Sequence, residues 1–335
     1  MYYVGLDVHY RTTTMCILDG CGRRVKFKTV RGHWTKAVDR LAELDGPFEV
    51  VFEATCGYGP LFDQLAQRAR RVVMAHPGLL RLIFRATRKN DRVDAEKLAK
   101  LLYLDEVPAA HVPGVDVREW RELIEFRRRL VDKHTECKNQ IRALIRGHGL
   151  TAPRSLWSRK GLAWLAGLSW PTVSSRLRRD MLLEDYHGYQ RKIRTATRVL
   201  DRIGKRHPGV QLLRTIPGVG ARTAEAIVAY LDDPQRFSRG SQVASYFGLV
   251  PRQDASGGVN RLGHISKQGP GTVRKYLVQA AWQAVRRDAR VRARFERIAG
   301  GCRERRKVAL VAVARWLAGC MFAMLRTGEV WREAA

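Results

Sequence analysis

The stretch Tyr-Val-Gly-Leu-Asp-Val-His, residues 3–9, decides how the N-terminal part of this chain folds. Residues 2–8 alternate around apolar positions, and such alternation is typical of a β-strand. Asp7 stands among these apolar positions near the end of the strand, where a charged side chain costs free energy unless it has a partner or a function. The position of Asp7 therefore predicts a functional carboxylate at a strand end.

The segments that follow predict a mixed α/β domain. The turn Asp-Gly-Cys-Gly at 19–22 joins two strand-like runs, and the continuous apolar run at 48–52 is typical of a buried central strand. Asp91 is placed to cap the last helix of this part. The expected strands are 2–8, 12–18, 23–30, 48–52 and 71–75, and the expected helices are 33–44, 61–68 and 91–104.

Three further carboxylates lie at the ends of these elements. Glu53 ends the apolar strand in Val-Val-Phe-Glu-Ala-Thr, and Asp91 and Asp94 lie one helical turn apart in Lys-Asn-Asp-Arg-Val-Asp-Ala. Magnesium-type ions prefer oxygen ligands, and clustered carboxylates resist joint ionisation without a cation. We predict that these three acids and Asp7 hold Mg²⁺, with Mn²⁺ as the alternative ion, beside a nucleic-acid phosphate. The simpler interpretations are an N-cap for Asp91 and a surface ion pair for Asp94.

Composition indicates a polyanionic partner. The 335 residues carry a formal net charge of +30, from 62 basic and 32 acidic residues, which favours nucleic acid, with an anionic membrane surface as the alternative. The six cysteines show no Cys-x-x-Cys or zinc spacing, so reduced thiols are expected. We expect no signal peptide, because the sequence opens on a strand-like run, and Arg315 interrupts the apolar run at 308–325. We expect a buried helix at 308–325, no membrane partner, and a cytoplasmic location.

The remaining chain divides into a helical middle and a C-terminal part. Long Arg-rich helical stretches at about 117–148 and 186–207 suit an antiparallel pair or a coiled-coil dimer element, with a less regular segment at 151–171 between them. Helices are expected again at 272–298 and 306–325. The predicted domains are 1–112, 113–208 and 209–335.

The stretch Thr-Ile-Pro-Gly-Val-Gly-Ala-Arg-Thr-Ala, residues 215–224, resembles a helix-hairpin-helix motif. In that motif a Gly-x-Gly turn, here Gly218 and Gly220, lets backbone N–H groups reach a DNA phosphate. Such contacts position DNA without reading its sequence. The alternative is a tight turn between two helices without a ligand.

Ser256 lies in the most distinctive downstream stretch, where it precedes two glycines. Its hydroxyl could be exposed on a flexible turn, although serine is a weak nucleophile unless a base or a metal site activates it. His264 is a candidate base. The alternative is an ordinary Ser-Gly-Gly turn. The basic residues expected to hold a phosphate near this serine are Arg252, Arg261, Lys267 and Arg274.

These motifs, in this order, resemble the transposases of the IS110 family. The stretches around the four acids match that family's Asp-Glu-Asp-Asp pattern. Ile-Pro-Gly-Val-Gly, Tyr-Phe-Gly-Leu-Val-Pro-Arg and Ala-Ser-Gly-Gly with Ile-Ser-Lys-Gln-Gly match its C-terminal domain. The match spans nearly the whole chain and is least distinctive at 115–205.

The resemblance implies a RuvC-like domain of RNase H fold with four metal-binding acids, a helical coiled-coil middle, and a C-terminal transposase domain in which Ser256 is the nucleophile. It also implies a DNA recombinase guided by a bridge RNA that pairs with donor and target DNA. A dimer or tetramer is implied, in which the acids of one protomer act with the serine of another. The chain departs from the family pattern at Gln253-Asp254-Ala255, so the role of Asp254 stays open.

Two other functions stay open beside the recombinase. A metal-dependent nuclease of the junction-resolving type would use water as its nucleophile, and a basic scaffold would bind nucleic acid with an inert acid cluster. The presence of both acids and serine favours a recombinase, because a covalent phosphoserine preserves bond energy for rejoining. The positive charge would bind RNA and DNA through phosphates, while base pairing reads the sequence.

Overall fold

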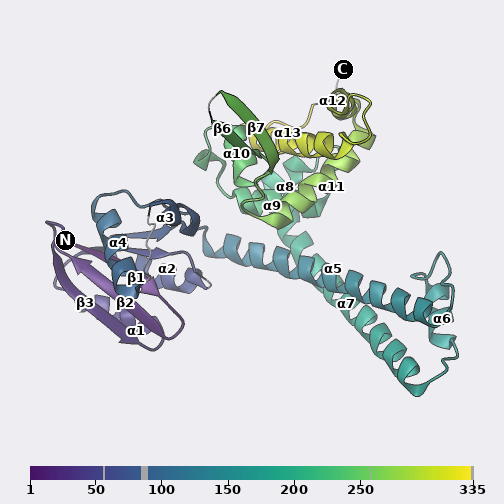
Figure 1. The fold of residues 1–335 in the computed structure, drawn as a ribbon, viewed down its shortest axis with the longest axis horizontal. Helices are drawn as coiled ribbons and strands as arrows, with labels where there is room; N and C mark the ends of the chain where they lie inside the picture. The colour runs from purple at the N-terminus through teal and green to yellow at the C-terminus, as the bar shows by residue number, and fades with distance from the viewer. Residues whose placement is uncertain (56, 84–89, 257, 333–335) are drawn as a thin grey trace. The chain divides into compact units, whose positions relative to one another are not determined.

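The computed structural model describes residues 1–55, 57–83, 90–256 and 258–332, and of Ser256 it describes the backbone alone. These residues form two compact units, Met1–Arg118 and Glu119–Ala335 (Figure 1). The first unit combines a sheet with helices, and the second is mostly helical. The predicted mixed α/β fold with a mostly helical C-terminal part is therefore confirmed.

A five-stranded sheet lies at the centre of the first unit, in the order β3-β2-β1-β4-β5. β2 pairs antiparallel with β1 and β3, whereas β1, β4 and β5 run parallel to one another. This arrangement agrees with the RNase H-like sheet that the resemblance implies, and each strand agrees with its expected range to within one residue. The strands are β1 (Tyr2–Val8), β2 (Thr12–Leu18), β3 (Arg24–Arg31), β4 (Phe48–Glu53) and β5 (Arg71–Ala75).

Alternate residues of β1 pack on opposite faces of the sheet, as the pleat of a strand requires. Leu6 is fully buried in a cluster that includes residues of α1 (Thr35–Leu41) and α2 (Tyr58–Ala66). On the other face, Gly5 lies directly against the backbone of α4 (Asp91–Tyr103). The odd-numbered positions of β1 therefore face α4.

A side chain at position 5 would collide with α4. A Cβ on Gly5 would lie 2.1 Å from the carbonyl oxygen of Ala95 and 2.5 Å from the amide nitrogen of Ala99. Because both atoms are backbone atoms of a packed helix, we expect Gly5→Ala to destabilise the fold by about 2–3 kcal/mol, as overpacking does. Thermal unfolding measures this loss. Gly46→Ala is the control, since its Cβ would meet the ring of Tyr2 at an ordinary 3.7 Å. Equal melting temperatures for the two variants would contradict the packing argument.

The cap of α4 differs from the prediction. Asn90 has an extended backbone, and its side-chain oxygen accepts a hydrogen bond from the amide of Arg92 at 3.0 Å. Asn90 is therefore the N-cap, and Asp91 is the first helical residue. The short helix α3 (Pro77–Ile83) was not predicted, because seven residues are too few to show helical periodicity.

The long helices α5 and α7 lie side by side in the second unit (Figure 1). α7 begins at Val173, earlier than predicted, because Thr172 caps it through the amide of Ser175 and its first turns carry Ser and Arg where apolar periodicity was sought. The helices are α5 (Val115–Gly147), α6 (Arg159–Gly167), α7 (Val173–Arg206), α8 (Pro208–Leu213), α9 (Ala221–Leu231), α10 (Gly240–Tyr246), α11 (Gly271–Arg287), α12 (Ala289–Ala299) and α13 (Arg306–Thr327), with a 3₁₀ turn at Pro234–Arg236.

The helix predicted over 272–298 is two helices, α11 and α12. Asp288 interrupts it with an extended backbone, and its carboxylate accepts hydrogen bonds from the amides of Arg290 and Val291 at 2.9 and 3.1 Å. The indole of Trp331 donates to the same carboxylate at 3.0 Å. From the sequence alone, an aspartate within a helical pattern is most simply interpreted as a surface residue. In the structure Asp288 is instead the N-cap of α12.

Within the described ranges, α13 is the one helix long and apolar enough to cross a membrane. Half of its most apolar stretch is buried inside the protein. Leu317 and Met321 are fully buried in a core cluster that also contains residues of α9, α11 and α12. α13 thus packs as a core helix.

Candidate metal centre and serine hairpin

The sheet register places Asp7 and Glu53 at neighbouring strand ends. Leu6 in β1 pairs with Phe52 in β4, so Asp7 and Glu53 each follow that pair by one residue. Since Leu6 and Phe52 are buried together on the α1 and α2 side, the two acids project toward the face that α4 covers. Glu53 is exposed, and the side chain of Asp7 is 20% exposed.

α4 brings Asp91 and Asp94 toward the same edge of the sheet. Both acids lie in the first turn of α4, where the positive end of the helix dipole stabilises negative charge. The close contact of α4 with Gly5, two residues before Asp7, fixes the helix against this edge. An oxygen of Asp94 also lies 3.9 Å from Nζ of Lys97, so the surface pair considered for Asp94 exists beside its predicted role.

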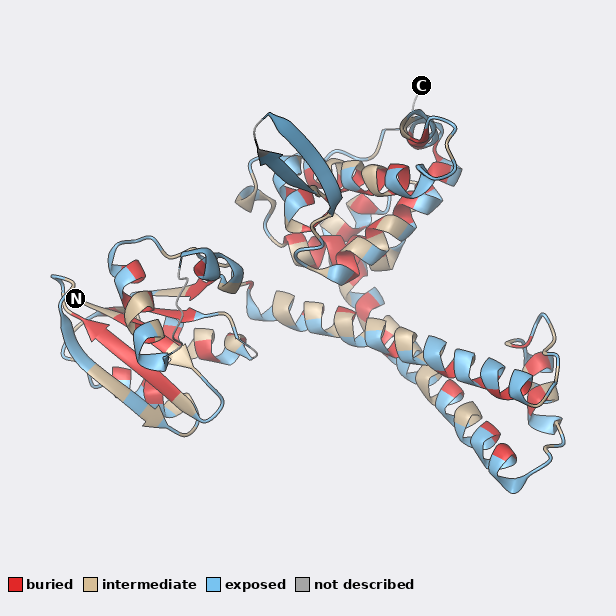
Figure 2. Cartoon of the chain, in the orientation of Figure 1, coloured by how far each residue is buried: buried red, intermediate tan, exposed pale blue. Residues whose placement is uncertain are grey.

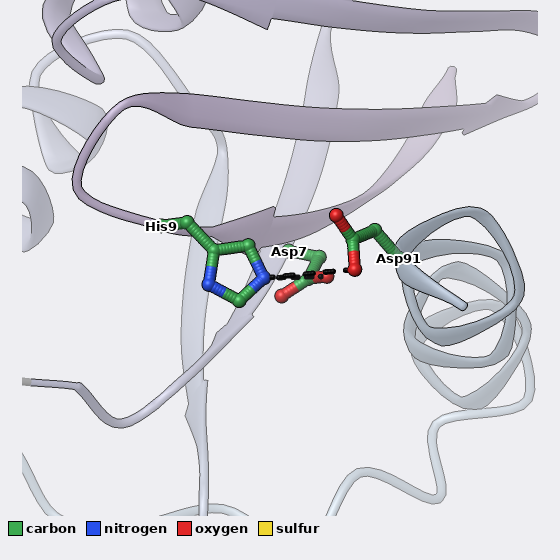
Figure 3. A group of neighbouring side chains, drawn as sticks. All are labelled: Asp7, His9 and Asp91. Atoms are coloured by element: carbon green, nitrogen blue, oxygen red, sulfur yellow. Dashed lines mark ion pairs between the residues drawn. The ribbon is translucent and has the colours of Figure 1, made fainter. Parts of the chain in front are cut away.

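His9 joins this cluster, and sequence reasoning did not include it. Its Nε2 lies 3.3 Å from an oxygen of Asp7 and 3.8 Å from an oxygen of Asp91 (Figure 3). The three ligand atoms lie within 4.8 Å of one another, whereas Glu53 and Asp94 are not part of this group among the described residues. Its position two residues after Asp7 could have indicated this, because side chains two residues apart in an extended chain lie on the same face.

The electrostatics of the cluster fit a divalent cation. Burial raises the pKa of Asp7; His9 lowers it, while the charges of Asp91 and Asp94 raise it. When burial and two neighbouring carboxylates disfavour the ionised form of an acid, a bound cation stabilises that ionised form. Carboxylate oxygens suit Mg²⁺, and an added imidazole also suits Mn²⁺. The residues of this cluster therefore fit the metal that the four predicted acids imply.

Ser256 ends one strand of a hairpin in the second unit. The hairpin consists of β6 (Pro251–Ser256) and β7 (Val259–Ile265), and the backbone of Ser256 pairs with that of Val259 across the turn. The side chain of Ser256 and all of Gly257 lie outside the described residues. Apart from Ser256, almost all residues of the two strands are exposed (Figure 2). The hairpin backbone thus presents Ser256 near its turn.

Charged residues line this hairpin. Arg252 and Arg261 are exposed, as is the candidate base His264. Asp254 lies opposite Arg261 in the strand register, so it is placed as the cross-strand neighbour of a basic residue. Asp254 departs from the family pattern, and its role stays open beside this register.

Two other predicted phosphate ligands follow the hairpin. Lys267 is exposed, with a left-handed backbone at φ 56°. The guanidinium of Arg274 donates to the carbonyl oxygens of Phe247 and Gly269, at 3.1 and 3.2 Å, and to that of Gln268. Burial lowers the pKa of Arg274. Arg274 therefore holds the loop before α11, and its contact with phosphate stays a prediction.

The two glycines of the Pro-Gly-Val-Gly turn differ in their surroundings. Gly218 has φ +91°, and a Cβ there would lie 2.6 Å from the amide nitrogen of Ala284, so Gly218 allows the turn to pack on α11. Gly220 precedes α9, no side chain caps that helix, and no atom lies within 4 Å of a Cβ built at Gly220. The start of α9 therefore has no side-chain cap, and the contact of its first amides with a DNA phosphate stays a prediction.

Glu225, on α9, is buried near this turn. Its carboxylate accepts a hydrogen bond from Arg222 at 2.7 Å, and burial raises its pKa from 4.5 to about 7. Because the folded state binds this proton more tightly than the unfolded chain, its contribution to stability is complete below about pH 4.5. That contribution is lost as pH rises to about 7, by about 1.4 kcal/mol per pH unit.

We therefore expect Glu225→Gln to raise the free energy of unfolding by about 3 kcal/mol at pH 8 and to leave it unchanged near pH 4. Urea unfolding at the two pH values measures the difference. Glu304→Gln removes an exposed glutamate and should change stability little at either pH. An equal effect of Glu225→Gln at both pH values would contradict the assignment.

Two family profiles match the chain. A profile described as a DEDD transposase of the IS110 type matches residues 4–149 and contains the four acids. A second, described as the transposase IS116/IS110/IS902 family, matches residues 210–296 and contains the glycine turn and the serine hairpin.

Individual transposases are similar over much of the chain. A probable family 20 transposase of Pseudomonas aeruginosa is 29% identical over 68% of this chain and 68% of its own length. The transposase for insertion sequence element IS1111A of Coxiella burnetii is 30% identical over 58% of this chain and 54% of its own length. The transposase for insertion sequence element IS1328 of Yersinia enterocolitica is 28% identical over 70% of both chains.

The acid cluster on an RNase H-like sheet and these similarities together define an insertion-sequence transposase. The profile matches on both units specify which kind: the chain belongs to the IS110 family. DNA binding and DNA recombination follow from that membership.

Proposed function

We propose that this transposase cleaves and rejoins strands of donor and target DNA through a covalent bond to Ser256, with Mg²⁺ or Mn²⁺ held by the four predicted acids. The observation that carries this proposal is the convergence of Asp7 and Asp91, with His9, within 4.8 Å at the edge of the sheet. An inert scaffold would have no reason to gather acids there against the desolvation of Asp7.

The proposed chemistry exchanges one phosphate ester for another. The Oγ of Ser256 attacks phosphorus, a new oxygen–phosphorus bond forms, and the ester oxygen of the leaving strand departs with the proton that the serine gives up. In the second half, a strand-end hydroxyl attacks the phosphoserine, and the serine oxygen leaves and recovers a proton. Because the ester count is unchanged, rejoining needs no external energy source.

The residues around the two motifs have distinct parts in this chemistry. A divalent metal at the acid cluster would neutralise charge at phosphorus. Asp7 and Asp91 would hold it, with Glu53 and Asp94 completing the site through direct or water-bridged contacts. Arg252 and Arg261, exposed on the hairpin that carries Ser256, would hold the phosphate by charge-assisted hydrogen bonds.

We also propose that a bridge-type guide RNA pairs with donor and target DNA. The net charge of +30 supports this, because a protein that holds RNA and DNA together must neutralise many phosphates. Base pairing would then choose the site. Such a complex would act in the bacterial cytoplasm, at the nucleoid. Omitting the RNA should abolish site-specific cleavage; cleavage at the same site without RNA would contradict this part.

A dimer or tetramer formed through residues 117–207 is part of the proposal. Val173, Leu177 and Met181 are 74%, 57% and 59% exposed at successive turns along one side of α7. An apolar stripe of this kind on a long helix favours pairing with a second helix. Light scattering with RNA and DNA present should give a dimer or tetramer; a monomer would contradict it.

The test of the main proposal is a denaturing gel of protein incubated with end-labelled donor DNA, cognate RNA and Mg²⁺. We expect a protein-linked DNA band that EDTA prevents. Free cleaved DNA without such a band would mean that water is the nucleophile and that the enzyme is a nuclease.

A further inference from the structure

α12 presents a row of arginines on its solvent side. Its opposite side is buried in the core through Val291, Phe295 and Ala299. The arginines recur at helical spacing and therefore share one face; they are Arg290, Arg294 and Arg297. Together with Arg315 on α13, they form what we call the arginine face.

Aromatic rings hold two of these guanidinium groups in place. The Cζ of Arg294 lies 4.7 Å from the ring centroid of Trp316 on α13, and that of Arg290 lies 5.1 Å from the centroid of Trp331. The two indoles contact each other edge to face at 5.9 Å. In the part of the chain that the structure describes, no carboxylate pairs with Arg294, Arg297 or Arg315. The guanidinium of Arg294 is thus oriented and not neutralised.

Two hollows meet at Arg294 and Trp316. One, of about 380 Å³, extends along α12 past Arg297. The other, of about 580 Å³, extends past Arg315 over a floor of small residues that includes Gly319. No carboxylate lines either hollow. A flat, uncharged group could lie on the floor while anionic groups reach the arginines at the rim.

We propose that the arginine face binds an unpaired nucleotide within a single strand of nucleic acid. The base stacks on the guanidinium plane of Arg294 and extends the stack that begins with Trp316, and Arg297 and Arg315 hold the flanking phosphates. A duplex offers phosphates but no exposed base face. An apolar protein segment would leave three guanidinium groups unpaired.

This site is separate from the chemistry proposed above. None of the four acids, the hairpin residues or the turn glycines lines either hollow. The inference rests on the proposed function only in that both involve nucleic acid. Binding at the arginine face needs no metal, so it can be measured in EDTA, where strand cleavage is absent.

The test is fluorescence anisotropy of the full chain with labelled oligo-dT, oligo-U and a duplex of equal length, in EDTA. Trp316→Leu and Arg294→Gln should each weaken single-strand binding at least about fivefold, because stacking contributes that much per base, and duplex binding less than about twofold. Arg303→Gln removes the same charge from an exposed position outside both hollows and should change either affinity less than about twofold.

Four outcomes distinguish the proposed site from uniform electrostatic attraction. If Trp316→Leu and Arg294→Gln lose more affinity for oligo-U than for oligo-dT, the ligand is RNA. If they lose more affinity for oligo-dT, the ligand is DNA, and either result supports the site. Equal losses from Arg294→Gln and Arg303→Gln, or equal losses on duplex and single strand, would overturn it in favour of uniform electrostatic attraction. Because Trp316 is half-buried, Arg297→Gln at an exposed position gives the same test without disturbing the core.

Discussion

We expect Ser256→Ala to remove the covalent protein–DNA product and to lower strand transfer by at least about 10³-fold, the scale of loss when an enzyme loses its nucleophile. The reason is chemical: alanine has no oxygen to form the bond to phosphorus, and water as a substitute would release the strand without storing the ester. The acid cluster is untouched by this change, so metal binding should persist. The measurement is quantification of adduct and joined product on a denaturing gel.

Ser266→Ala is the matched control. Ser266 follows the same hairpin, and its Oγ has no hydrogen-bond partner among the described residues, so its loss removes a hydroxyl without breaking a contact. We expect adduct and strand transfer close to those of the unchanged protein. Full cleavage by Ser256→Ala would exclude this serine as the nucleophile and would support the water-using nuclease.

We expect Asp7→Asn to lower the rate of DNA cleavage at least about 10²-fold. The same substitution should raise the free energy of unfolding of the metal-free protein. Burial, with the charges of Asp91 and Asp94, raises the pKa of Asp7, so its ionised form is less favourable in the folded protein than in the unfolded chain. Its contribution to stability is therefore complete at low pH and is lost as pH rises through the raised pKa. Asparagine keeps the shape without the charge, so the gain is expected near neutral pH.

Thermal unfolding in EDTA and cleavage assays in Mg²⁺ measure the two effects on one protein. Asp45→Asn removes an exposed acid of the same unit and should change neither. A variant Asp7→Asn that still cleaves DNA would contradict the metal site. A lower melting temperature in EDTA would contradict the desolvation argument for Asp7.

Strands and acids were predictable because both leave short-range signals. The alternation around Asp7 and the apolar run before Glu53 placed both acids at strand ends, and parallel register then makes those ends neighbours. His9 was missed because a histidine after a strand has many ordinary explanations, and its distance to Asp91 depends on how α4 packs on Gly5. That packing is a tertiary contact, which no local pattern contains.

Helix ends were less predictable, since capping depends on single polar side chains. Asn90 caps α4 one residue before the expected Asp91, and Asp288 splits a helix that apolar spacing had predicted as continuous. The packing of Gly218 is a similar case: its turn sequence predicts a phosphate contact, which stays a prediction, but the sequence gives no sign that Gly218 also lies against the backbone of α11. In each case the deciding partner is a particular atom brought close by the fold.

The most direct measurement is mass spectrometry of the DNA-linked protein after nuclease trimming and trypsin digestion. Trypsin cuts after Arg252 and Arg261, and the peptide Gln253–Arg261 between them contains Ser256 as its sole hydroxyl side chain. The account predicts that the nucleotide mass is carried by this peptide. A nucleotide on any other peptide, or cleaved DNA with no modified peptide at all, would contradict it.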